Sequence, residues 1–154
     1  MMSLLLLAAT YINPCNALAQ HNDPHFTGLS IQILKLVNAH RAEMGLRPLK
    51  MNDQISPYAE QHSHNMAIKK APFGHDGFDS RIESVSRKVP SNSWAENVAY
   101  GSDDAKEIVD MWLHSSGHRK NIEGDYNQTG IGISGNRNGT YYYTQIFIRS
   151  KQSR

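Results

Sequence analysis

TGIGISGNRNGTYYYTQIFIRS, residues 129–150, decides the fold class of this chain. Two runs rich in β-branched and aromatic residues flank the sequence GNRNG, and its Asn138-Gly139 step is typical of a β-hairpin. In the second run Tyr143 and Phe147 share one face with their alternate neighbours, while Ile146 and Ile148 belong to the other. Neither face is plainly polar, so both faces must be buried away from water. The pattern therefore predicts helices on both sides of a small, mainly antiparallel sheet.

Upstream of this hairpin, apolar residues recur at helical spacing in three segments. The predicted elements are helices over residues 30–44, 53–69 and about 103–113, a shorter helix over 80–86 and an extended segment over 94–100. Ser30 is a candidate cap for the first helix, and Ser102 or Asp103 for the third. Helices before and after a central sheet predict the α/β class, as a three-layer α/β/α sandwich.

Composition restricts the class of protein. A chain of 154 residues fits a single domain, and 39% hydrophobic with 19% charged residues is typical of a globular protein. The formal net charge is +2 and the sequence pI is about 8.7. Lysine and arginine are scattered rather than clustered, which argues against a nucleic-acid partner. We expect a monomer.

The N-terminal segment predicts export. An apolar run from Leu4 to Ile12 is too short to cross a bilayer, and Ala17-Leu18-Ala19 fits a signal-peptidase site. We therefore expect a signal peptide over residues 1–19, a flexible leader over 20–29 and the folded domain over 30–150. Because Cys15 leaves with the signal peptide, the mature chain would have no cysteine. The short apolar run leaves with it too, so we also expect no transmembrane helix in the mature chain. The predicted location is secreted, either extracellular or periplasmic.

Three separated stretches combine an ionisable residue with a predicted loop. They are FGHDGFDSR with His75, WAENVAYG with Glu96, and SSGHRKNI with His118. Ends of elements are where site residues tend to lie, so these three are the candidate site. Each has a structural alternative: the histidines could hold their loops in place, and Glu96 could accept bonds from backbone amides near Asn97.

Other histidine pairs are weaker candidates. His62 and His64 are two residues apart on a predicted helix and point in nearly opposite directions, so they cannot share a metal ion. His114 and His118 have the spacing of a helical zinc pair, but the acidic residue of the H-E-x-x-H motif is absent.

The chemistry of the candidate site allows two interpretations. Two imidazoles and one carboxylate can hold Zn²⁺ with a water molecule in the fourth position. Without metal, a carboxylate beside an imidazole selects its tautomer and forms an acid/base pair. No serine, threonine or cysteine is placed as a nucleophile, which argues against a covalent mechanism.

The chain resembles a known family. FGHDGFDSR, AENVAYG, MWLHSSGHRKNI, TGIGIS and YYYTQIF, in this order and at these separations, are similar to motifs of the CAP superfamily (cysteine-rich secretory proteins, antigen 5 and pathogenesis-related 1), in its bacterial SCP-like form. The resemblance covers residues 30–149 and implies an α/β/α sandwich with a cleft lined by two histidines and acidic residues. His75 and His118 match the two histidines, and Glu96 matches the acid of the family's GEN motif.

The sequence departs from the family pattern in three places. Ala95 replaces the glycine of GEN, and residues 113–116 contain no acid where members with a full tetrad carry the second one. The disulfides of animal and plant members are also missing. A complete site of two glutamates and two histidines is therefore not expected.

The predicted function is an exported binding module that holds a lipid, sterol, envelope glycan or protein over His75, Glu96 and His118. Ligand contacts are predicted for Trp112 and Arg119, although Trp112 also fits the core and Arg119 a solvated face. Zn²⁺ or another divalent metal is a possible cofactor, with His75 and His118 as its ligands. The alternative is a hydrolase that uses the same cleft, with Glu96 as base. Arg81 is predicted to pair with a carboxylate rather than bind a ligand.

Overall fold

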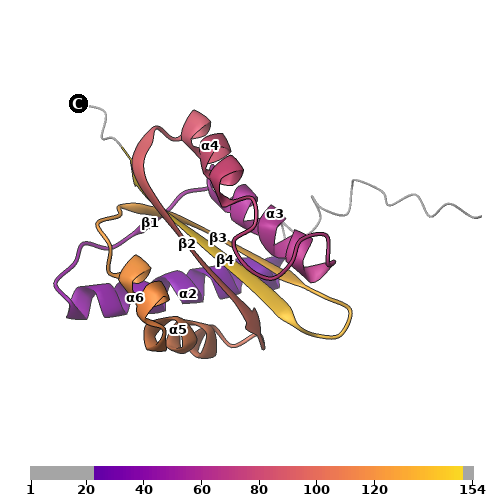
Figure 1. The fold of residues 1–154 in the computed structure, drawn as a ribbon. Helices are drawn as coiled ribbons and strands as arrows, with labels where there is room; N and C mark the ends of the chain where they lie inside the picture. Colours follow the sequence, from indigo (N-terminus) through magenta and orange to yellow (C-terminus); the bar gives the residue numbers. More distant parts are fainter. Residues whose placement is uncertain (1–22, 151–154) are drawn as a thin grey trace, which may run out of the picture.

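The computed structural model describes residues 23–150, so the predicted signal peptide lies outside the described residues. The elements are α2 (Pro24–Glu43), β1 (Lys50–Met51), α3 (Ser56–Ala67), α4 (Phe78–Lys88), β2 (Ser91–Gly101), α5 (Ala105–His114), α6 (Ser116–Ile122), β3 (Gln128–Gly135) and β4 (Tyr141–Ser150). The four strands form one sheet in the order β1-β3-β4-β2 (Figure 1). Only the two-residue β1 runs parallel to its neighbour β3; the other pairs are antiparallel.

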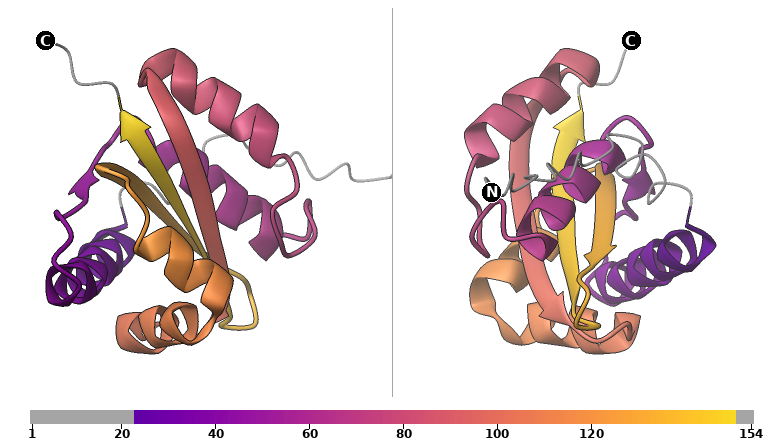
Figure 2. Two further views of the ribbon diagram at one scale, coloured as in Figure 1. Left: turned by 60° about the vertical axis from the view of Figure 1, so that its left-hand side comes forward. Right: turned by 90° about the vertical axis from the view of Figure 1, so that its right-hand side faces the viewer.

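Helices cover both faces of this sheet, as Figure 2 shows. Helices α2, α5 and α6 share a core with Tyr143 and Phe147 of β4. Helices α3 and α4 share a second core with Ile146 and Ile148 of the same strand. The alternation of β4 therefore separates two cores, and the predicted three-layer α/β/α sandwich with a mainly antiparallel sheet is confirmed.

The predicted hairpin joins β3 to β4. Asn136 Oδ1 accepts hydrogen bonds from the backbone N–H groups of Asn138 and Thr140, at 2.9 and 3.0 Å. Gly139 has φ +77°, a left-handed conformation that favours glycine. Asn138-Gly139 marks the turn correctly, within a connection of five residues.

Helix α2 begins six residues earlier than predicted. The side chain of Asp23 accepts a hydrogen bond from the N–H of His25, and Pro24 occupies the first turn. Leu29 is already buried in the core. The expectation of a flexible leader is thus wrong from Pro24 onward, because the polar composition there hid a capped helix start. The cap of α5 was also misassigned: Asp104, not Ser102 or Asp103, accepts from the N–H groups of the first turn.

A further short helix, α6, was not predicted. Ser115 adopts an extended conformation that ends α5, and the chain then turns again until Ile122, which is buried. His118 therefore lies within α6, and Glu96 lies in the middle of β2. The loop prediction is wrong for His118 and for Glu96, but the extended segment predicted over residues 94–100, which contains Glu96, is confirmed. His75, between α3 and α4, does lie in a loop.

Strand β2 is an edge strand whose outward carbonyl groups are taken by side chains. The carbonyls of Trp94, Glu96 and Val98 accept from Tyr126 Oη (3.4 Å), Asn121 Nδ2 (3.2 Å) and Trp112 Nε1 (3.1 Å). These bonds satisfy an edge that could otherwise pair with another chain. They also hold α5 and α6 against β2. Among residues 23–150, no helix has the length and apolar character needed to span a membrane.

Candidate functional site

The buried carboxylate of Glu96 is the centre of the site. Its side chain is 1% exposed. Oε1 lies 3.0 Å from His75 Nδ1 and 2.8 Å from Arg81 Nη2, and Oε2 lies 2.8 Å from Arg81 Nε. The partners are thus side chains, not the backbone amides considered above. The forked arginine contact is the geometry in which a guanidinium binds a carboxylate most strongly.

Local structure explains why these groups meet. Alternation along β2 turns Glu96 toward the face that α3 and α4 cover. Gly77, at φ +74°, lets the chain turn into α4, which presents Arg81 in its first turns. Arg81 Nη1 also donates to the carbonyl of Asp76, at 3.2 Å, and so fixes the loop that carries His75. The predicted pairing of Arg81 with a carboxylate is confirmed.

A third imidazole, His62, lies behind this pair and was not predicted as part of the site. His62 is 3% exposed, and its Nε2 donates to the carbonyl of Gly74 at 2.7 Å. The same nitrogen lies 4.0 Å from Glu96 Oε1. Because His62 falls on the apolar stripe of α3, its sequence position indicates burial and gives no sign of this partner. The bond to Gly74 fixes the backbone next to His75.

Burial lowers the pKa of His62, and the nearby positive charge of Arg81 acts in the same direction. The unfolded chain would protonate this imidazole near its ordinary value of about 6.5, while the folded chain resists the proton. The contribution of neutral His62 to the free energy of unfolding is therefore complete above about pH 6.5 and is lost as the pH falls below that value. We expect the free energy of unfolding to be lower at pH 5 than at pH 7.

Chemical denaturation of wild type and His62→Gln at both pH values tests this expectation. Glutamine can still donate to Gly74 but does not titrate, so the loss between pH 7 and pH 5 should be smaller in the variant. Equal losses in the two proteins would show that His62 is not responsible.

The second predicted histidine, His118, is held beside this group by α6. Its carbonyl accepts from Asn97 Nδ2 at 3.1 Å, and Asn121 Nδ2 bonds to Asn97 Oδ1 at 2.9 Å. The pKa of His118 is lowered, first by partial burial and then by the charge of His75. Asn97 follows Glu96 in β2, so these hydrogen bonds hold α6 against the strand that carries Glu96.

The two residues predicted to contact ligand differ in exposure. Trp112 is 1% exposed and belongs to the core, where it donates to Val98. Arg119 is exposed and lines a hollow of about 360 Å³ on α6 together with Ser116 and Tyr126. Neither Glu96 nor His75 lines that hollow.

The donor set does not fit a metal site with three protein ligands. Both oxygens of Glu96 already accept hydrogen bonds, and within residues 23–150 no group of three His, Cys, Asp or Glu side chains has metal-binding geometry. His75 and His118 would have to serve as the only protein ligands, which is fewer than a zinc site normally uses.

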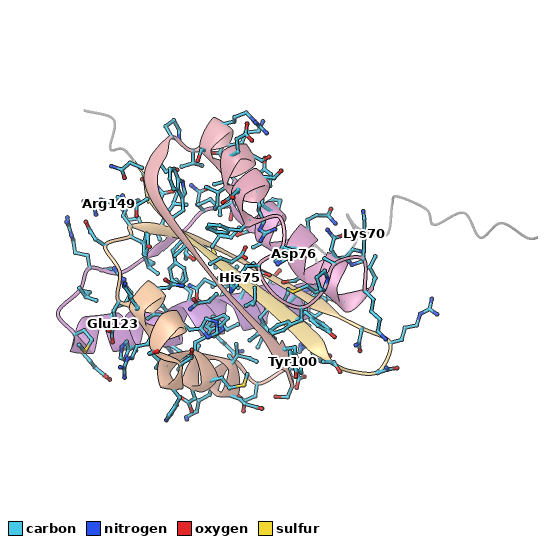
Figure 3. The ribbon with its side chains drawn as sticks, viewed as in Figure 1. Lys70, His75, Asp76, Tyr100, Glu123 and Arg149 are labelled. Atoms are coloured by element: carbon cyan, nitrogen blue, oxygen red, sulfur yellow. The ribbon has the colours of Figure 1, made fainter. Side chains whose placement is uncertain are left out.

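The three-layer α/β/α sandwich and the motifs that carry His75, Glu96 and His118 both indicate a CAP domain. The profile of the cysteine-rich secretory protein family (CAP) matches residues 34–147, and the chain belongs to this family. Figure 3 shows the side chains of the domain, with His75 over the middle of β2.

Two proteins of Bacillus subtilis are similar in sequence. The uncharacterized protein YkwD is 33% identical over 120 residues, which cover 76% of this chain and 46% of YkwD. The uncharacterized membrane protein YlbC is 33% identical over 124 residues, or 77% of this chain and 34% of YlbC. The chain thus spans less than half the length of these relatives.

Solved structures share the fold. An extracellular SCP-domain protein of Bacillus anthracis has a TM-score of 0.66 and 28% identity, covering 92% of this chain and 45% of that one. An outer surface protein of Borrelia burgdorferi has a TM-score of 0.71 and 16% identity, with coverage of 80% and 94%. A cysteine-rich secretory protein of Staphylococcus aureus has a TM-score of 0.67 and 23% identity, with coverage of 82% and 40%. The predicted family is confirmed.

Proposed function

We propose that this protein is the binding domain of an exported CAP protein and holds its ligand over His75 and His118 without breaking a bond. The observation that carries the proposal is the burial of Glu96 in its ion pair with Arg81. A general base must come within hydrogen-bond reach of the proton that it removes. The Glu96 side chain is 1% exposed and its charge is paired with Arg81, so Glu96 serves as an anchor rather than as a base.

His75 is the residue that faces the ligand in this proposal. Because Glu96 accepts at Nδ1, the neutral imidazole carries its proton there and leaves a lone pair on Nε2. The His75 side chain is 51% exposed, so Nε2 can accept a hydrogen bond from a ligand. His118, whose carbonyl is bonded to Asn97, contributes a second, partly buried imidazole.

One observation favours a second function, a hydrolase. A carboxylate that fixes the tautomer of an exposed imidazole, as Glu96 does for His75 at 3.0 Å, is the arrangement in which histidine acts as general base. Under that alternative His75 would activate a water molecule and Glu96 would be a positioning residue. A divalent metal held by His75 and His118 belongs to the same alternative.

A retention experiment tests the binding proposal. Immobilised wild type, the His75→Ala/His118→Ala double variant and a control, His114→Ala, are exposed to a mixture of lipids, glycans and envelope proteins. His114 is exposed and bonds to the carbonyl of Asp110 in its own helix, so its removal should change nothing. At least one ligand should be retained by wild type and the control but lost from the double variant; equal retention by all three would refute the proposal.

Calorimetry with Zn²⁺ separates the two functions. If the site binds ligand without metal, wild type should show no heat of Zn²⁺ binding that the His75→Ala/His118→Ala variant loses. A saturable signal that disappears in this variant and persists in His114→Ala would favour the metal-dependent hydrolase.

A further inference from the structure

We propose that the ligand is a glycan, and that its sugar rings stack on three neighbouring aromatic side chains, Phe73, Tyr100 and Tyr142, called here the aromatic strip. This inference rests on the proposed binding function and names the chemical class of its ligand.

The three rings come from separate segments and contact one another. Phe73 belongs to the loop between α3 and α4, Tyr100 to the end of β2 and Tyr142 to the start of β4. The ring centroids of Phe73 and Tyr100 are 4.9 Å apart, with an edge-to-face angle of 83°. Tyr100 and Tyr142 are paired on the neighbouring strands β2 and β4, and their ring centroids are 6.0 Å apart. Each ring is thus in contact with the next.

Two rings of the aromatic strip are open to solvent. Phe73 is 49% exposed and Tyr100 is 55% exposed, while Tyr142 is partly buried. Single exposed aromatic residues are ordinary, but a contiguous exposed set of them marks a binding surface. A tyrosine ring offers an apolar face together with a hydroxyl group that donates and accepts hydrogen bonds.

The aromatic strip is continuous with the site at His75. Tyr100 and Glu96 lie on the same face of β2, four residues or about 13 Å apart along the strand. Phe73 precedes His75 by two residues, and the bond from His62 to the carbonyl of Gly74 holds the residue between them. Figure 3 shows His75 over the middle of β2 and Tyr100 near the end of that strand. One extended ligand could therefore contact both.

Charge and shape favour a neutral sugar polymer. Arg81 offsets the charge of Glu96, and His75 in the tautomer set by Glu96 presents a lone pair that suits a hydroxyl or acetamido donor. An acyl chain needs an enclosed channel to leave water, whereas the rings of Phe73 and Tyr100 lie half exposed. Sugar rings have apolar faces and hydroxyl edges, which match the rings and the polar groups of the strip.

Titration with two soluble probes, the β-1,4-linked hexamers of N-acetylglucosamine and of glucose, tests the inference by calorimetry and tryptophan fluorescence. At least one hexamer should bind wild type. Tyr100→Ala and Phe73→Ala should each weaken that affinity about tenfold or more, because each removes a stacking face. Tyr100→Phe keeps the ring and should bind within about threefold of wild type. Ile31→Ala is the control, since Ile31 is an exposed apolar residue on α2, 59% exposed and outside the strip.

Failure of this inference can be told apart from failure of the proposed function. If neither hexamer binds, the glycan assignment is wrong. If a hexamer binds wild type and both ring variants equally, the aromatic strip is not its binding surface and the inference is overturned. Sedimentation with vesicles of phosphatidylglycerol provides the competing outcome: vesicle binding that Phe73→Ala abolishes would assign the strip to a lipid surface and overturn the glycan. In either case, a ligand retained through His75 and His118 would leave the binding function standing.

Discussion

Arg81→Ala is expected to lower the free energy of unfolding by about 3–5 kcal/mol, because it leaves a buried carboxylate without its cation. The side chain of Arg81 is 10% exposed and that of Glu96 is 1% exposed, so water cannot replace the lost partner. His75 would remain as a donor at 3.0 Å. The single hydrogen bond from His75 does not replace the forked, charged contact with Arg81.

Urea denaturation at pH 7 measures this loss, with Arg87→Ala as the control on the same helix. Arg87 forms an ion pair with Glu83 at 2.8 Å, but both side chains are more than 60% exposed. Its removal should cost less than about 0.5 kcal/mol. The double variant Arg81→Ala/Glu96→Gln should be more stable than Arg81→Ala alone, since it removes the stranded charge. A cost for Arg81→Ala near that of the control would mean that the pair contributes little to folding.

Gly132→Ala is expected to destabilise the domain by about 3 kcal/mol or more. A Cβ atom at this position would lie 2.0 Å from the backbone nitrogen of Glu60 and 2.3 Å from the carbonyl carbon of Ala59, in α3. These are backbone atoms, so no side-chain rotation relieves the clash. Helix α3 would have to move off β3, which would also break the 2.9 Å hydrogen bond from Ser63 to the carbonyl of Gly132.

Thermal unfolding followed by circular dichroism tests this effect, with Gly28→Ala as the matched control. Gly28 lies inside α2, and a Cβ atom there meets nothing within 4 Å. Alanine at that position should raise stability by about 0.5–1 kcal/mol, because it restricts the unfolded chain and favours the helix. A Gly132→Ala protein that unfolds at the wild-type temperature would show that α3 and β3 do not pack this closely in solution.

The fold could be predicted well because its main signals are local and repeated. The alternation of Tyr143, Ile146, Phe147 and Ile148 marks two apolar faces, and each face has its own core in the structure. Asn138-Gly139 marks the turn of the hairpin. Signals that depend on one or two polar residues were less clear: the Asp23-Pro24 helix start and the break at Ser115 both escaped the periodic pattern.

The candidate site could be predicted only in part. The motifs around His75, Glu96 and His118 identified the residues, and the resemblance to CAP proteins supplied their common location. They did not reveal how Glu96 is bonded. Arg81 is 15 residues from Glu96 along the chain, and its fork could equally have met another acid.

By itself, the sequence determined the class of fold, the two apolar faces of the sheet, the hairpin and the family, because these follow from the order of apolar residues and from motifs in register. Only the tertiary structure decided which groups satisfy Glu96, that His62 is buried behind it, and that the rings of Phe73, Tyr100 and Tyr142 contact one another. The physical reason is that a carboxylate or an aromatic ring has no preferred partner within its own stretch of chain. Its partner is whichever side chain the packed layers bring within a few ångströms.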